Sequence, residues 1–160
     1  MAVTGYWFTR GISQAFGGVS AAEAPLVDWM SDSASIKVAL MDSSYTPSQT
    51  ANDFWNDVSA YDTDAVQAVT GYTAGGKTFS AATTLYNTAG SGKTITFDAP
   101  DIVWTTATLS ASFAVLYKDS GTASTSPLLA YLVFGANVPA VAGDFTISWN
   151  AAGIATITVA

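Results

Sequence analysis

Residues 113–134 constrain the fold of this chain most, because two apolar runs flank a polar loop there. Residues 113–117 alternate apolar side chains toward one face, and residues 128–134 are apolar on both faces, with Leu128, Leu132 and Phe134 expected on the same face. The loop Lys118–Ser126 is rich in hydroxyl groups. This pattern predicts a β-hairpin with a mobile, solvated tip, whose second strand is covered on both sides.

The remaining sequence is also dominated by strand patterns. Residues 36–41 form a short apolar run, and the odd positions from 103 to 117 form an apolar stripe that predicts one long strand or two joined at a bulge. Further strands are predicted over 77–86, 93–98 and 145–149, with a closing strand that ends at Val159. Seven or eight strands predict a mainly β fold, an antiparallel β-sandwich or jelly-roll-like domain over residues 31–160.

Residues 1–30 differ from this pattern and predict an N-terminal helical arm. Apolar residues fall at helical spacing before Gly17-Gly18, a typical helix end. The helix either covers the domain's own core or, headed by aromatic residues, docks on a neighbouring subunit. The candidate capsid or subunit interface residues are Tyr6, Trp7, Phe8, Ile12 and Phe16.

A second, short helix is predicted after Thr50, which would cap it, with Asp53 at its third position and Phe54 and Trp55 supplying apolar contacts. Four acidic residues lie in or after it, and their spacing lacks the glycine and terminal glutamate of a calcium loop. They are Asp53, Asp57, Asp62 and Asp64. We therefore expect them to lie in a solvated loop, and we expect Asp98 and Asp101 to form turns around Pro100.

The composition argues for a binding role and against catalysis. Charged residues are only 11% of the 160 and hydrophobic residues 49%, so part of the exterior is expected to be buried against other chains. The net charge of −7, without a basic cluster, disfavours nucleic acid and anionic membranes as partners. The absence of His and Cys removes the usual general base, nucleophile and metal ligands, so we expect no enzyme, metal or cofactor. No signal peptide or membrane span is apparent.

One motif invites a different interpretation. Residues 71–78, GYTAGGKT, match the phosphate-loop pattern letter for letter. Phosphate binding of that kind needs a strand before the loop and a helix after it. The residues after Thr78 are rich in Thr and have strand character, so we expect a glycine turn that starts a strand.

Four segments together resemble a widespread group of small structural proteins of tailed bacteriophages. They are IKVALMDSSYTPSQTANDFWNDVS (36–59), GYTAGGKT (71–78), AVLYKDSGTASTSPLLAYLVFG (114–135) and GDFTISWNAAGIATI (143–157). The resemblance implies a non-enzymatic virion component, a capsid decoration (cement) protein that binds the major capsid protein on the capsid exterior. It also implies a homo-oligomer, with a trimer as the expected form, that is present in the host cytoplasm during assembly.

Two alternatives remain open at this stage. A tail, baseplate or head-fibre protein would use the loop Lys118–Ser126 to contact a host receptor. A carbohydrate-binding β-sandwich would stack a sugar on Trp55, Trp104 or Trp149. The alternation places Trp149 with Phe145 and Ile147, which favours a core position for it.

Overall fold

The computed structural model describes residues 4–15, 27–29, 31–79, 83–87 and 93–159 of the chain. As predicted, these residues are mainly antiparallel β-sheet, in a five-stranded sheet of order β1-β7-β6-β2-β3 and a three-stranded sheet of order β4-β5-β8. The strands are β1 Thr4–Trp7, β2 Ile36–Met41, β3 Lys77–Thr78, β4 Thr83–Asn87, β5 Lys93–Asp98, β6 Ile102–Lys118, β7 Leu128–Ile147 and β8 Ala155–Val159. The helices are α1 Thr9–Ala15 and α2 Thr63–Val66, with short 3-10 helices η1 Trp55–Asp57, η2 Ser59–Tyr61 and η3 Ala123–Thr125.

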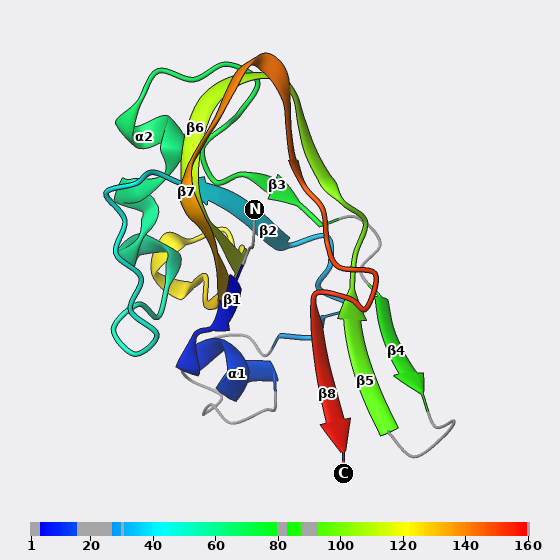
Figure 1. Cartoon of the computed structure of the whole chain (residues 1–160). Coiled ribbons are helices and arrows are strands. Elements are labelled where there is room, and N and C mark those ends of the chain that lie inside the picture. The colour runs from blue at the N-terminus through cyan, green and yellow to red at the C-terminus, as the bar shows by residue number, and fades with distance from the viewer. Residues whose placement is uncertain (1–3, 16–26, 30, 80–82, 88–92, 160) are drawn as a thin grey trace.

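The predicted hairpin is confirmed as the antiparallel pair β6–β7, which is much longer than expected. The two strands run together from beside the three-stranded sheet, arch over the top of the molecule and descend into the five-stranded sheet (Figure 1). The segments predicted separately at 128–134 and 145–149 are therefore largely one strand, which ends at Ile147. The tip is solvated as expected, since residues 120–125 are exposed, and only at the base of the loop is Ser126 buried, with its hydroxyl donating to the Thr122 carbonyl at 2.9 Å.

Bulges change which residues of β6 face the larger core. The core-facing positions are even at Ile102 and Trp104, odd at Ala107 and Leu109, and even again at Leu116. The predicted stripe of odd positions is therefore wrong at both ends of the strand. The prediction fails because the pairing of β6 with β7 shifts register several times. One of these shifts includes Thr106, which has a φ of 54°.

A further register shift changes the facing of β7. Tyr117 pairs with Leu128, whereas Leu116 pairs with Ala130, so Leu129 is an extra residue. As a result Leu128 packs on the outer side of the sheet, the side that residues 42–66 cover. Leu132 packs on the inner side, in the larger core between the two sheets. The expectation that these two leucines share a face is wrong for this reason.

The larger core is built around aromatic side chains that connect the two sheets. The Trp29 ring lies 6.5 Å from that of Trp7 in β1 and 5.6 Å from that of Phe97 in β5. Phe79 lies 5.5 Å from Trp29 on a third side. Burial of several large rings together contributes a major part of the hydrophobic free energy of folding and fixes the sheets relative to one another.

The outer face of the five-stranded sheet is covered by the segment 42–66, which differs from the predicted helix. Thr50 caps no helix there. Instead the Asp57 carboxylate accepts hydrogen bonds from the backbone N–H groups of Asp53 and Phe54, at 2.8 and 3.0 Å, immediately before η1 begins. This holds the chain in short 3-10 turns that press Val58 into the sheet, where it is fully buried.

Candidate functional site

Strand β1 places the predicted aromatic residues in three different environments. Tyr6 is 42% exposed and stacks on Tyr131 of β7, with ring centroids 5.1 Å apart. Trp7 points to the other face of the sheet, toward Trp29. Phe8 is fully buried and packs against Tyr131. Tyr6 is thus the residue of the three that is available to a partner, and Phe8 belongs to the chain's own core.

Helix α1 brings one further predicted residue to the surface. Ile12 is 43% exposed, and Phe16 lies outside the described residues. Gly11, which disfavours a helix by propensity, has a packing reason here, because a Cβ would lie 2.5 Å from the Leu129 carbonyl oxygen. The glycine lets α1 lie directly on β7. On the same helix, the Arg10 guanidinium lies over the Phe54 ring and is paired with Asp53 at 3.3 Å.

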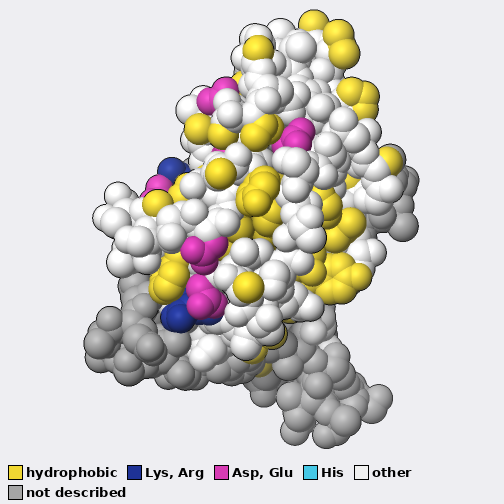
Figure 2. Space-filling view, turned by 90° about the vertical axis from the view of Figure 1, so that its left-hand side faces the viewer, with side chains coloured by type: hydrophobic (Ala, Val, Ile, Leu, Met, Phe, Trp, Pro, Cys, Tyr) yellow, Lys and Arg dark blue, Asp and Glu magenta, His cyan; other side chains and the backbone are white. Residues whose placement is uncertain are grey.

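Tyr6 is one of several partly exposed apolar side chains on the outer side of the sheet, which we call the tyrosine face. Its members are the side chains of Tyr6, Tyr61, Phe113 and Val133, and the buried ring of Tyr131 packs beneath Tyr6. Phe113 and Val133 are a cross-strand pair, and the buried ring of Tyr45 lies 5.5 Å from both Phe113 and Tyr61. Figure 2 shows hydrophobic side chains exposed on the viewed side of the molecule, with acidic and basic side chains between them.

A buried carboxylate secures the segment beside this face. Asp62 is 1% exposed and accepts hydrogen bonds from the Gly75 N–H at 2.8 Å and the Tyr72 hydroxyl at 3.1 Å. The Tyr72 hydroxyl in turn accepts from the Leu40 N–H of β2 at 3.0 Å. Burial raises the pKa of Asp62, against the lowering effect of the Gly75 hydrogen bond. The prediction that Asp62 lies in a solvated loop is therefore wrong.

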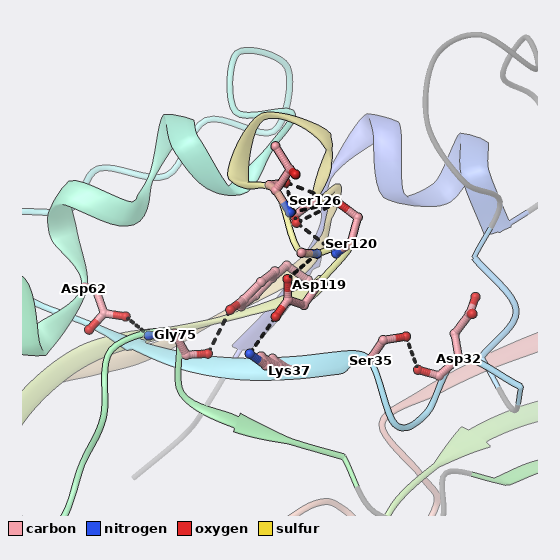
Figure 3. A network of polar contacts seen from close by, with 11 residues as sticks. Asp32, Ser35, Lys37, Asp62, Gly75, Asp119, Ser120 and Ser126 are labelled. Atoms are coloured by element: carbon pink, nitrogen blue, oxygen red, sulfur yellow. Dashed lines mark hydrogen bonds and ion pairs between the residues drawn. The ribbon is translucent and has the colours of Figure 1, made fainter.

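The same network continues across the end of the sheet (Figure 3). The Gly75 carbonyl accepts from the Tyr117 hydroxyl at 2.9 Å, and Lys37 is paired with Asp119 at 2.6 Å. The hydrogen bond from Lys37 holds the pKa of Asp119 below its usual range. Hydrogen bonds within the loop Lys118–Ser126 use its hydroxyl groups on one another, so the structure supplies no arranged set of free polar groups there.

The glycine motif at 71–78 forms a turn followed by a strand, as expected. Gly75 and Gly76 both have positive φ, and Lys77 begins β3. The Lys77 ammonium group donates to the Val103 carbonyl at 2.5 Å. A helix whose N-terminal amides could hold a phosphate does not follow the turn within the described residues.

A groove lies on the inner side of the sheet, next to β1. Its volume is about 520 Å³, and it is lined mainly by apolar side chains with a few neutral polar groups. The lining includes Gly5 of β1, Leu132 and Phe134 from one end of β7, Phe145 and Ile147 from its other end, and Trp149. Gly5 contributes no side chain, and this leaves the groove open next to the strand.

The three tryptophans considered for sugar binding differ in exposure. Trp104 is 1% exposed and belongs to the core. Trp55 is half-buried and stacks on Tyr117 at 4.3 Å, and Trp149 is half-buried against Phe79. The Asp101 carboxylate, one of the two acids expected to form turns, accepts from the Trp149 N–H at 3.0 Å and so fixes its position.

The sequence did not predict strand β1, the groove or the tyrosine face. No group of three or more acidic side chains suited to a metal ion occurs in the part of the chain that the structure describes. No helix among those residues has the length and hydropathy to cross a membrane. Comparisons of the chain with family models, curated proteins and solved structures found no match.

Proposed function

We propose that this chain is a non-enzymatic structural protein of a tailed-bacteriophage virion, a capsid decoration protein that binds the major capsid protein from outside. The observation that carries the proposal is the tyrosine face, an uncharged aromatic surface on a rigid sheet. Aromatic side chains are enriched in the centres of protein interfaces, where they bury a large area at low entropic cost.

The positions of the resembling motifs support this proposal. The segment 36–41 is β2, and the segments 114–118 and 128–135 lie in β6 and β7. These are the three central strands of the sheet that presents the tyrosine face. The motifs thus build the scaffold of the proposed docking surface.

The electrostatics also fit a binding protein. The cations of Arg10, Lys37 and Lys118 are each paired with an aspartate. The net charge of −7 therefore leaves an acidic exterior around an apolar face, and such a surface selects a neutral or basic partner. If the chain is a homo-oligomer, the expected trimer would engage several capsid subunits at once and gain affinity by effective concentration. In this proposal the two sheets serve as the layers of a β-sandwich.

The proposal is tested by adding the purified chain to undecorated shells of the major capsid protein. We expect saturable binding at a copy number of the order of hundreds per shell, and a higher melting temperature of the decorated shell. Tyr6→Ser should weaken binding, whereas Val141→Ser, at a residue 80% exposed outside the tyrosine face, should not. Absence of binding would refute the proposal, and a handful of copies confined to the tail would favour the tail alternative.

A further inference from the structure

Strand β1 has one hydrogen-bonding edge that β7 does not use. β1 is the last strand in its sheet, and it pairs with β7 in a register that aligns Tyr6 with Tyr131. The Phe8 N–H donates to the Leu129 carbonyl at 3.0 Å in the same register. Because bonded and unbonded positions alternate in antiparallel pairs, Tyr6 exchanges hydrogen bonds with Tyr131, and Gly5 and Trp7 direct their backbone groups away from β7.

That free edge is short and well defined. The Trp7 carbonyl accepts from the Gln49 side-chain amide at 2.7 Å, and the Thr9 N–H donates to the Gln49 carbonyl at 3.0 Å. Gln49 thus closes the edge beyond Trp7. The N–H and C=O of Gly5 and the N–H of Trp7 remain, and no described residue pairs with them.

The two faces beside this edge differ in a way that suits an added strand. A residue of the added strand opposite Gly5 would project its side chain to the inner face, toward the groove that Gly5 leaves open. Its neighbours would project to the outer face, beside the stacked rings of Tyr6 and Tyr131. Along the added strand, one side chain would therefore contact the apolar groove and the next would contact the aromatic rings.

Other unpaired edges of the same sheet lack this arrangement. The open side of β7 beyond Phe134 is interrupted by Pro139, which has no N–H, and by Gly135 and Ala142, which have positive φ. At the opposite edge of the sheet, β3 has two residues and carries Lys77. Natural sheets use such devices to prevent pairing with other chains, and β1 has none of them.

We propose that β1 binds an extended segment of another protein as an added strand, with apolar side chains at alternate positions and basic residues at its ends. The charge of the chain selects this occupant over a second copy, since two copies each carry a net charge of −7. The exposed carboxylate of Asp101 lies next to a groove residue, because it accepts a hydrogen bond from the Trp149 N–H. The inference goes beyond the capsid proposal and does not require it.

The test uses the full chain and an acetylated, amidated probe peptide of sequence KTVTVTVTK, whose lysines are replaced by glutamates in a control peptide. We expect the basic peptide to bind and to slow amide hydrogen exchange at Gly5 and Trp7. We expect the acidic peptide to bind at least about tenfold more weakly, because it approaches a chain of net charge −7 that carries Asp101 beside the groove.

Two matched variants locate the binding edge. Thr4→Lys adds a positive charge on β1 and should weaken binding of the basic peptide about fivefold, whereas Thr78→Lys makes the same change on the exposed β3 and should leave it unchanged. Gly5→Val should weaken binding about tenfold by filling the groove edge. A thermal melt of this variant checks that the fold is kept, since the new Cβ lies 3.3 Å from the flexible tip of the Leu132 side chain.

The outcomes separate the possible occupants. The proposal is supported if the basic peptide binds the unchanged chain, if the β1 variants weaken this binding, and if the β3 variant does not. It is overturned by no binding at millimolar peptide, by equal binding of both peptides, or by equal effects of the two lysine variants. Protection of Gly5 in the chain alone, rising with its concentration, would identify a second copy as the occupant and would also overturn it. Failure of these tests with intact shell binding would leave the capsid proposal standing.

Discussion

The two edges of the five-stranded sheet are built differently. β3 has two residues, begins with a lysine and follows the paired glycines Gly75 and Gly76. β1 has four residues, none of them charged, and carries Tyr6 beside a glycine. Short, charged edges prevent unwanted pairing, so the sheet is closed at β3 and left open at β1. In the proposal made above, the open edge at β1 is the side of the sheet that receives a partner.

The largest effect on stability is expected from a substitution that disrupts the closed edge at β3. Gly76→Ala places a Cβ 1.9 Å from the Val38 carbonyl oxygen at a φ of +74°, so β3 cannot pair with β2 as it does. We expect a loss of about 4 kcal/mol in the free energy of unfolding, from strain and overpacking together. Gly121→Ala is the control, because it has a similar φ of +84° and nothing within 4 Å. It should cost about 1 kcal/mol by urea denaturation, and equal losses would contradict the packing argument.

The next largest effect on stability is expected when the carboxylate that holds the turn before β3 is removed. Asp62→Ala leaves the Gly75 N–H and the Tyr72 hydroxyl without their acceptor in a buried site. We expect a loss of about 3 kcal/mol in the free energy of unfolding. Asp64→Ala removes an exposed acceptor of the Ala74 N–H and should cost about 0.5 kcal/mol. A loss at Asp62 no larger than at Asp64 would show that the buried bonds contribute little.

The same residue gives the chain a characteristic pH dependence. The pKa of Asp62 is raised above its ordinary value of 3.8 by burial, so the folded state binds this proton more tightly than the unfolded state does. Its contribution to stability is present below that value and is lost as pH rises through the folded pKa. Asp62→Asn should remove this decline in urea denaturation measured upward from about pH 4. An unchanged pH profile would contradict the assignment.

A smaller effect is expected at the open edge. Tyr6→Ala removes the stack on Tyr131 and should cost about 1 kcal/mol in the free energy of unfolding. Val141→Ala, at a residue 80% exposed, should be neutral within error. A thermal melt of both variants checks this. If Tyr6→Ala unfolded the chain outright, the residue would be a core element and could not serve as a free docking side chain.

The smallest effect concerns charge near the closed edge. Lys37→Met removes the ion pair with Asp119, in which both side chains are about 30% exposed. We expect a loss of about 0.5 kcal/mol at low salt that fades in high salt. The pKa of Asp119 is lowered chiefly by the Lys37 hydrogen bond, so this stability is present above pH 3.8 and is lost as pH falls through the folded pKa. A salt-independent loss would point to packing of the lysine stem instead.

Local patterns were sufficient to predict several strands. β2 and β5 occupy the predicted residues, because both are short runs bounded by turn residues. The continuity of β7 was missed because Gly135 and Pro139 normally end a strand, and here pairing with β6 carries the strand past them. The changes of face along β6 come from bulges, which leave no period in the sequence.

The site was harder to predict than the fold. Tyr6 and Trp7 were assigned to a helical arm, since four residues are too few to show the alternation of a strand. The burial of Asp62 depends on Gly75 and Tyr72, which the fold brings to it from later in the chain. The groove depends on both ends of β7 meeting beside Gly5, and such an arrangement is visible only in three dimensions.

Amide hydrogen exchange on the full chain, free and saturated with the basic peptide KTVTVTVTK, tests the asymmetry of the two edges most directly. The account predicts slower exchange at Gly5 and Trp7 in the bound state and unchanged exchange at Lys77 and Thr78. Protection confined to β3, or bound chain with no protection at β1, would contradict it.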